Sequence, residues 1–298
     1  MGGRIIIMNV LSLFDGMSCG QLALTKANIE YHSYYASEID DSAMRVAKHN
    51  FPNTIHIGNV LNIKTNDLPK IDLMIGGSPC QGFSQVGKGY NFNDPRSILF
   101  FQYVRILREC NPKYFLLENV CMKKEWANVI SDHLQVDPIM IDGGLVSAAT
   151  RRRLYWTNIP YITQPQNRHI TFDDINQHDT HWMAIERVNK IAKWKTFMKP
   201  YERAIVIGTK MKVGCLVARG YNEYASSIKL ITDGKNYRTL THEEAELCMG
   251  IPVGYTSIAN DRERSRMIGN GWNIDVVAHI FNHIKNPIQY NTLEHFLT

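Results

Sequence analysis

The chain has 298 residues, of which 44% are hydrophobic and 20% charged, which suits one large domain or two unequal ones. No apolar run approaches the roughly 18 residues of a membrane span, and the N-terminus lacks a signal-peptide or N-myristoylation pattern, so we predict a cytoplasmic protein without membrane contact. Six scattered cysteines with no CxxC pair predict no zinc site, and therefore no metal, and argue against a disulfide framework.

Positive charge is concentrated in one part of the sequence. The formal net charge is +5, yet residues 187–238 contain 12 Lys or Arg and 3 Asp or Glu, a local charge of +9 that leaves −4 for the rest. One basic segment on a mildly acidic protein favours contact with a polyanion. A solvated basic face is the alternative explanation.

The first 160 residues alternate between short apolar stretches and helical patterns. We expect strands at 5–14, 31–40, 54–60, 68–77 and 113–120 and helices at 21–28, 42–51 and 97–110. Two further strands are expected at 137–149 and 151–159. This alternation predicts an α/β fold with a parallel, doubly wound sheet.

The pattern changes after Pro160 and returns near residue 238. The intervening stretch is polar and irregular, with one helix expected at 184–197 and short strands within 204–220, so we predict a separate small domain at 161–237. Thr241–Glu244 matches the T-x-x-E capping box that opens a helix. A last helix is expected at 262–284.

The stretch FDGMSCG, residues 14–20, joins the first expected strand to the first expected helix. Glycine there allows a ligand to approach the backbone, and Glu38, at the end of the next strand, is placed to bind ribose hydroxyls. The loop matches neither GxGxxG nor GxxxxGKS, so a nucleoside without phosphates, such as S-adenosylmethionine, fits better than a dinucleotide or a triphosphate. A plain strand–helix turn is the alternative.

The stretch GGSPCQGFSQ, residues 76–85, places Cys80 beside Pro79 in a glycine-rich turn after an apolar strand. A structural cysteine is usually buried within an apolar element. The position of Cys80 therefore favours a side chain presented to a ligand or substrate over a small buried hydrophobic residue.

Five motifs then follow in order: FDGMSCG at 14–20, GGSPCQGFSQ at 76–85, ENV at 118–120, RRR at 151–153 before LYW, and IGNGW at 268–272. Together they resemble the cytosine-C5 DNA methyltransferases, over about residues 8–160 and 238–281, and most closely the de novo branch and its bacterial and phage relatives. The resemblance implies a Rossmann-like methyltransferase sheet with a catalytic domain at 1–160 plus 238–298 and a target-recognition domain at 161–237. It also implies methyl transfer from S-adenosylmethionine to C5 of a cytosine flipped out of double-stranded DNA, at a short sequence.

The resemblance assigns four catalytic residues. The thiolate of Cys80 would add to cytosine C6 and make C5 nucleophilic. Glu118, poorly solvated at the end of an apolar strand, would donate or share a proton at N3. Arg151 and Arg153 would lie on one face of a strand and bind base oxygen, phosphate and the glutamate, while Asn119 would fix either the cytosine amino group or the cysteine loop. Surface or capping roles are the alternatives for Glu118 and the arginines.

The family's cofactor motifs map onto Phe14, Asp15, Gly16, Met17, Glu38, Ile39, Asn59, Val60, Gly77, Leu99, Asn270 and Trp272. Asn59 is a departure, because the family commonly has Asp there as the acceptor for the adenine amino group. We expect weakened cofactor binding from this exchange.

The resemblance places DNA contacts in two segments. Residues 81–95 would close over the flipped base, with Ser84 and Lys88 near the DNA, and Arg219, Tyr221 and Asn222 of the small domain would read bases. The variable small domain does not specify the target sequence.

Three alternatives remain open at this point. The substrate could be cytosine in RNA, the protein could be a non-catalytic member of the family, or it could be a Rossmann-type oxidoreductase with a reactive thiol. The cellular role (restriction-modification, phage self-protection or orphan), the exact donor group and the oligomeric state are not specified by the sequence.

Overall fold

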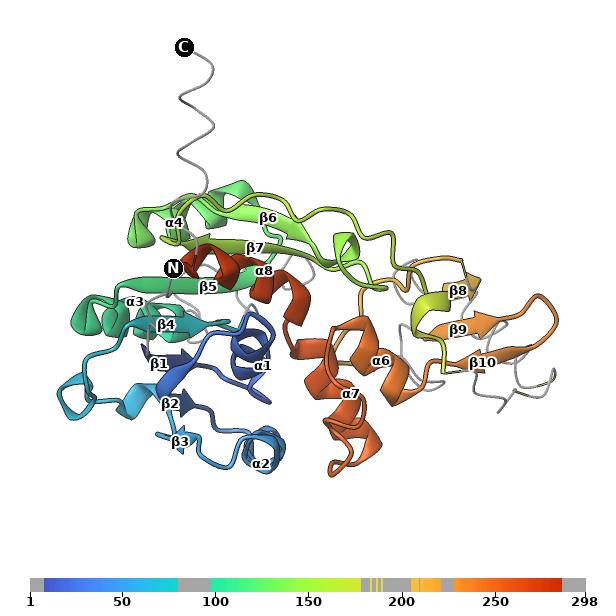
Figure 1. Ribbon diagram of the computed structural model, residues 1–298, viewed down its shortest axis with the longest axis horizontal. Coiled ribbons are helices and arrows are strands. Elements are labelled where there is room, and N and C mark those ends of the chain that lie inside the picture. The colour runs from blue at the N-terminus through green and yellow to red at the C-terminus, as the bar shows by residue number, and fades with distance from the viewer. Residues whose placement is uncertain are drawn as a thin grey trace, which may run out of the picture. The chain divides into compact units, whose positions relative to one another are not determined.

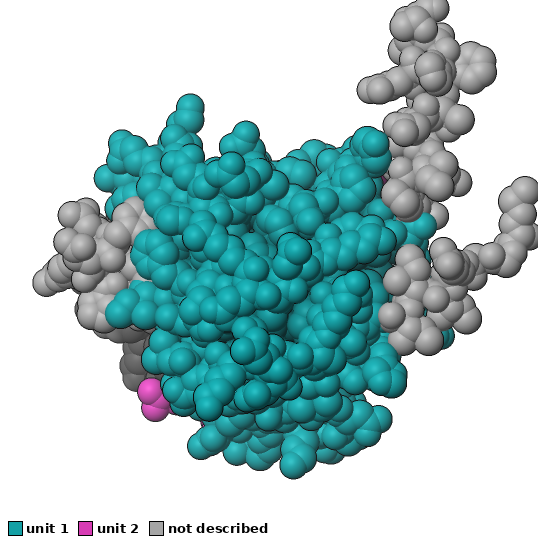
Figure 2. Space-filling view, turned by 90° about the vertical axis from the view of Figure 1, so that its left-hand side faces the viewer, with its two compact units in different colours: residues 1–141, 152–164, 276–298 teal, residues 142–151, 165–275 magenta. Residues whose placement is uncertain are grey.

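The computed structural model describes residues 8–79, 98–177, 205–208, 210–220 and 228–285, with single positions 183, 186 and 189 between them. The chain divides into two compact units, coloured in Figure 2: unit 1 is residues 1–141, 152–164 and 276–298, and unit 2 is residues 142–151 and 165–275. Compactness thus groups 238–275 with unit 2. The functional division at 161–237 stays a prediction, and the helix expected at 184–197 and the loop at 81–95 lie outside the described residues.

The sheet of unit 1 has seven strands among the described residues (Figure 1). They are β1 (Met8–Leu13), β2 (Tyr31–Ser37), β3 (Ile55–His56), β4 (Leu73–Gly76), β5 (Tyr114–Val120), β6 (Ile139–Asp142) and β7 (Arg152–Thr157). Their order is β3-β2-β1-β4-β5-β7-β6, in which the first five run parallel and β7 runs antiparallel to β5. The predicted doubly wound α/β fold is confirmed.

Helices cover both faces of this sheet. They are α1 (Cys19–Lys26), α2 (Asp41–Asn50), α3 (Ile98–Cys110), α4 (Lys124–Leu134) and α8 (Ile274–Lys285), with short 3-10 turns at Val60–Asn62 and Thr65–Asp67. Side chains alternate between the faces of a strand, so Met74 joins the core under α3 and α4, whereas Ile75 meets Gly20 of α1 on the other face. The β1 strand is almost fully buried, as expected for a strand covered on both sides.

Strands β1, β2 and β4 end in register at one edge of the sheet, and β5 extends three residues further, to Val120. Leu13 of β1 pairs with Ser37 of β2 and Gly76 of β4, and Gly76 pairs with Leu117 of β5. The loops that follow these strands carry the motifs singled out in the sequence. Ligands of such sheets bind beyond the carboxyl ends of the strands.

Unit 2 contains a three-stranded sheet of order β10-β9-β8, made from β8 (Ile205–Gly208), β9 (Lys229–Thr232) and β10 (Tyr237–Thr239). Its helices are α6 (His242–Cys248) and α7 (Asp261–Asn270), with 3-10 turns at Gly143–Leu145 and Asp173–Ile175. The capping box predicted at Thr241 and Glu244 is confirmed, since each side chain accepts from the other residue's backbone N–H.

One expectation about helices is wrong, and one helix was missed. The single helix expected at 262–284 is two helices, α7 and α8, because Gly271 takes an extended conformation after α7 ends at Asn270. Helix α4 follows the ENV motif but was not expected from the sequence. In the part of the chain that the structure describes, no helix has the length and apolar character of a membrane span.

A buried ion pair holds α6 to β10. Arg238 donates from both terminal nitrogens to the carboxylate of Glu244, at 2.7 and 2.8 Å, and the two side chains are 2% and 0% exposed. Removing one partner of such a pair leaves a buried charge without compensation.

We expect Glu244→Gln to lower the free energy of unfolding by about 3 kcal/mol. Glu243→Gln, on the same helix, should cost less than about 1 kcal/mol, because Glu243 is 38% exposed in its pair with Arg264. Urea denaturation of both variants tests this difference. Equal losses would contradict the role of the buried pair.

Candidate active site

The loop after β1 has an unusual backbone. Phe14, Gly16 and Ser18 all have positive φ angles, of 58°, 59° and 66°. Such angles are uncommon for residues other than glycine and carry a cost in conformational energy. A side chain at Gly16 would meet no atom within 4 Å, so the space above this residue is open to a ligand.

A buried polar network holds the loop in this shape. Asp15 accepts hydrogen bonds from Ser18 Oγ at 2.5 Å and from Tyr34 Oη at 2.7 Å, and Gln21 Nε2 donates to Ser18 Oγ at 2.8 Å. Burial raises the pKa of Asp15 to about 6, while the hydrogen bonds from the serines and Tyr34 oppose this shift. Asp15 is therefore an internal brace of the loop, although the sequence motif assigned it to the cofactor. Met17, assigned in the same way, is 2% exposed.

Glu38 connects the ends of β1 and β2. Its Oε2 accepts from the backbone N–H of Gly16 at 2.7 Å, and its Oε1 accepts from those of Ile39 and Asp40 at 2.7 and 2.9 Å. A carboxylate has about four lone-pair sites, so Glu38 can accept one more donor, such as a ribose hydroxyl. Glu38 both braces the loop and fits the predicted nucleoside.

Apolar side chains surround this edge of the sheet and are open to contact. Ile39 is 70% exposed and Leu61 is 51% exposed, while Val60 is buried and Leu99, in the first turn of α3, is partly buried. Exposed apolar residues next to a carboxylate that can accept a further hydrogen bond suit the flat face of a purine. Asn59 Oδ1 accepts from the backbone N–H of Leu61 at 3.0 Å, so this oxygen already caps a 3-10 turn.

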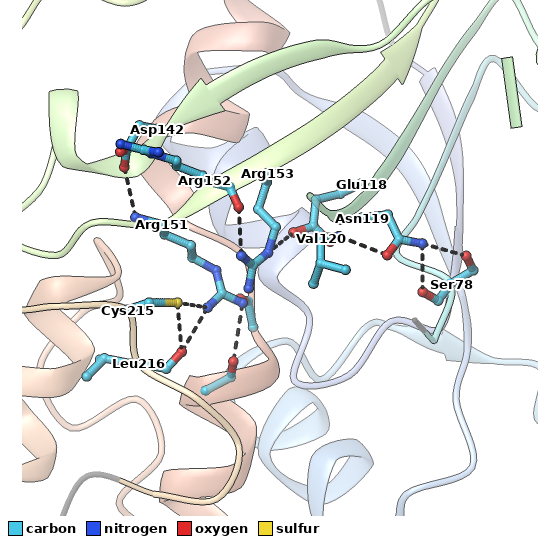
Figure 3. Close-up of polar contacts among 12 residues, drawn as sticks. Ser78, Glu118, Asn119, Val120, Asp142, Arg151, Arg152, Arg153, Cys215 and Leu216 are labelled. Atoms are coloured by element: carbon cyan, nitrogen blue, oxygen red, sulfur yellow. Dashed lines mark hydrogen bonds and ion pairs between the residues drawn. The ribbon is translucent and has the colours of Figure 1, made fainter. Parts of the chain in front are cut away.

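The segment that leads to the predicted nucleophile is fixed by β5. The amide of Asn119 donates to the carbonyl oxygen and to Oγ of Ser78, at 3.3 and 3.2 Å (Figure 3). Ser78 lies two residues before Cys80 and follows Gly77, the predicted cofactor contact. Of the two roles expected for Asn119, these bonds favour anchoring of the cysteine loop.

A buried ion pair occupies the end of β5. Glu118 and Val120 lie on one face of the strand, and Arg153 of β7 is paired opposite Val120, which makes Arg153 the diagonal neighbour of Glu118. Arg153 Nε lies 3.0 Å from Glu118 Oε1, and the side chains are 13% and 10% exposed (Figure 3). A carboxyl held this way is restricted in position and poorly hydrated.

Arg151 differs from the expectation that both arginines share one strand. Strand β7 begins at Arg152, so Arg151 precedes it and belongs to unit 2. Arg151 is 3% exposed, and its guanidinium donates to the carbonyl oxygens of Leu216, Gly269 and Gly271. These bonds occupy the terminal nitrogens of Arg151 with backbone carbonyl oxygens, whereas the sequence predicts a base or a phosphate as the partner.

The remaining predicted residues fall into two groups. The first group lies in unit 2. Asn270 is exposed and ends α7, Trp272 is 8% exposed and follows that helix, and Arg219 lies in the segment after β8. Outside the described residues lie Cys80, Ser84, Lys88, Tyr221 and Asn222. Their roles stay predictions.

Sequence reasoning missed the residues that support the site. Ser18 and Ser78 lie within the quoted motifs but were assigned no role, Tyr34 lies outside the motifs, and Ser147 is bonded to Asn273 in unit 2. The one available signal was their polarity within apolar stretches, because a buried polar group needs a partner.

The fold is shared with solved structures of low sequence identity. A DNMT2 from Spodoptera frugiperda has a TM-score of 0.70 at 19% identity, over 93% of this chain and 99% of that protein. The methyltransferase EhMeth of Entamoeba histolytica has a TM-score of 0.77 at 17% identity, over 95% of this chain and 99% of that one. These similarities establish a methyltransferase-type fold.

The chain belongs to the C-5 cytosine-specific DNA methylase family, which it matches over residues 8–131 and 147–286. Its cofactor is therefore S-adenosylmethionine, as the sequence predicts. The orphan methyltransferase M.Rho11sI of Bacillus phage rho11s is 43% identical over 115 residues, and the type II methyltransferase M.NgoBV of Neisseria gonorrhoeae is 40% identical over 114. The matched stretches cover 38% and 37% of this chain but only 23% and 27% of those proteins.

The raised pKa of Asp15 predicts how stability depends on pH. The unfolded carboxyl releases its proton near 3.8 and the folded one near 6, so the folded state holds this proton more tightly and loses stability as the pH rises between these values. From pH 5 to pH 7 this contribution falls by about 1 kcal/mol. Urea denaturation should show a smaller fall in the free energy of unfolding between pH 5 and pH 7 for Asp15→Asn than for the wild type. The same pH dependence in both proteins would contradict the role of Asp15.

Asn59 predicts an engineered gain in cofactor affinity. A carboxylate at this position could cap the 3-10 turn as well as Asn and offer a stronger acceptor to the adenine amino group. We expect Asn59→Asp to lower the Kd of S-adenosylmethionine by about five-fold, measured by titration calorimetry. An unchanged or higher Kd would show that Asn59 does not face the adenine.

Proposed function

We propose that this chain transfers a methyl group from S-adenosylmethionine to C5 of a cytosine flipped out of double-stranded DNA, at a short sequence, through a transient bond between Cys80 Sγ and C6. The observation that carries the proposal is the buried pair of Glu118 and Arg153 at the carboxyl end of β5. Next to it, Asn119 holds Ser78, two residues before Cys80. The proposal is supported by the pairing of β5, which carries Glu118, with β4, which precedes the segment leading to Cys80.

The chemistry follows from the electron flow in the ring. Addition of the Cys80 thiolate to C6 moves electrons toward N3, and a proton donated or shared by Glu118 would offset this charge. Arg153 holds the Glu118 carboxyl in one orientation, so that little rearrangement is needed during the reaction. C5 thereby becomes nucleophilic enough to accept a methyl group.

The cofactor supplies an electrophilic methyl group on a sulfonium ion when bound. Glu38 has a lone-pair site for a ribose hydroxyl, and the exposed Ile39 offers a surface for adenine. After methyl transfer, a base, for which a water molecule suffices, removes the C5 proton. The Sγ–C6 bond then breaks and the N3 proton returns to Glu118, which releases 5-methylcytosine and restores the Cys80 thiolate. S-adenosylhomocysteine is the second product.

The DNA substrate is part of the proposal, as are base flipping and the loop at 81–95 that would enclose the base. The basic segment at 187–238 supports a nucleic-acid partner, because Lys and Arg side chains neutralise phosphates. The names of the phage and Neisseria relatives favour modification of phage or host DNA, as an orphan enzyme or with a restriction system. Cytoplasmic location stays a prediction.

The test is mass spectrometry of nucleosides from plasmid DNA incubated with the protein and S-adenosylmethionine. We expect 5-methylcytosine with the wild type, none with Cys80→Ser, and a rate about 10²- to 10⁴-fold lower with Glu118→Gln. Cys121→Ser, a matched change at an exposed cysteine just after the ENV motif, should retain activity.

Absence of 5-methylcytosine with the wild type, despite measured cofactor binding, would overturn the proposal. A parallel incubation with total RNA separates the main rival, because 5-methylcytosine confined to RNA would assign the substrate to RNA. Activity retained by Cys80→Ser would exclude the covalent route.

A further inference from the structure

We propose that Arg151 is a positioning residue that couples cofactor binding to DNA binding. It would do so by joining the turn at 269–273, which carries the predicted cofactor residues Asn270 and Trp272, to the segment at 215–219, which ends in the predicted DNA contact Arg219. All of these residues belong to unit 2. The inference rests on the proposed function, since it assigns Arg151 a role in the same reaction.

The guanidinium of Arg151 spans two separate stretches of chain. Nη1 donates to the carbonyl oxygen of Leu216 at 3.1 Å and contacts Cys215 Sγ at 3.8 Å (Figure 3). Nη2 donates to the carbonyl oxygens of Gly269 and Gly271, at 3.2 and 2.7 Å. The planar fork of arginine presents two separate terminal nitrogens to acceptors on two sides, whereas the donors of an ammonium group share one nitrogen.

The two stretches also touch directly. A Cβ atom added to Gly269 would lie 2.2 Å from the carbonyl carbon of Val217 and 2.4 Å from the nitrogen of Ala218. Only glycine allows the end of α7 to approach the backbone of 217–218 this closely. A movement of the turn therefore pushes on the segment that leads to Arg219.

Arg151 itself is firmly held. Its backbone N–H donates to Asp142 Oδ1 at 2.9 Å, and its carbonyl accepts from Gly143 at 2.9 Å. The residues before it pair with Val213, which accepts from Thr150 at 2.9 Å and donates to Ala148 at 2.7 Å.

Residues 142–151 also anchor the C-terminal end of the turn at 269–273. Asn273 Nδ2 donates to Ser147 Oγ at 2.8 Å, and Ser147 Oγ in turn contacts the carbonyl oxygens of Gly143 and Ala149. The turn at 269–273 is thus fixed at both ends by residues 142–151. An arrangement this tightly packed shifts as a unit, so a ligand that orders the turn also orders the segment at 215–219.

The coupling is measured as the ratio of two dissociation constants of S-adenosylhomocysteine, determined by titration calorimetry on the full chain with and without saturating plasmid DNA. In the wild type we expect DNA to change this constant by about five-fold or more. Arg151→Met, which removes the fork at similar volume, should bring the ratio close to one.

Arg151→Lys keeps the charge and serves as the milder variant if Arg151→Met fails to fold. We expect Arg151→Lys to retain most of the wild-type Tm but to lose most of the coupling, since a role in stability alone would leave the ratio unchanged. Arg264→Met is the matched control, because Arg264 is also a buried arginine of unit 2, bonded to Glu243 and Thr256. It should lower the Tm and keep the ratio.

The outcomes separate this inference from the proposed function. A wild type that methylates DNA but shows no coupling, or a ratio unchanged in Arg151→Lys, overturns the role of Arg151 alone. Loss of the ratio in Arg264→Met to the same extent also overturns it, since any destabilisation would then suffice. A wild type that methylates no DNA overturns the proposed function, and the inference with it.

Discussion

The parallel alignment of β2, β1, β4 and β5 is the constraint on which the rest of unit 1 depends. Their registers place Leu13, Ser37, Gly76 and Leu117 side by side, so three loops begin at one edge of the sheet, where the last three residues of β5 extend beyond the other strands. Hydrogen bonds then join the loops in pairs: Glu38 binds the backbone of Gly16, and strand β5 binds the segment before Cys80 through Asn119. The loop that begins at Phe14 and the segment that ends at Pro79 are thereby held by the sheet itself.

The antiparallel strand β7 contributes Arg153, the ion-pair partner of Glu118. A buried Glu118 needs a partner, because an isolated carboxylate is strongly destabilising away from water. The antiparallel register supplies Arg153 on the same face, one diagonal step away. A parallel strand at this place would come from a crossover and would not bring this arginine to the end of β5. The pair of Glu118 and Arg153 is thus a product of strand direction as much as of residue type.

The two arginines of the R-x-R motif have different surroundings. Arg153 lies in β7 and pairs with a carboxylate, whereas Arg151 precedes the strand and donates to backbone carbonyl oxygens in unit 2. Both guanidinium groups are largely buried and need several acceptors, which each finds in a different place. One short motif therefore contributes both to the predicted chemistry and to the geometry of the segments that would bind the two substrates.

The sequence by itself determined the fold class, the family and the motif loops, because apolar periodicity and glycine-rich strand ends are local properties. It also singled out Glu38 and Glu118 as candidates, since a carboxylate after an apolar run is visible in the order of residues. Only the tertiary structure decided that the last helix breaks at Gly271, that Asp15 is an internal brace, and that Arg151 points into unit 2. Those outcomes depend on partners such as Tyr34 and Leu216, which are distant in sequence, and no local pattern specifies which buried polar groups will meet.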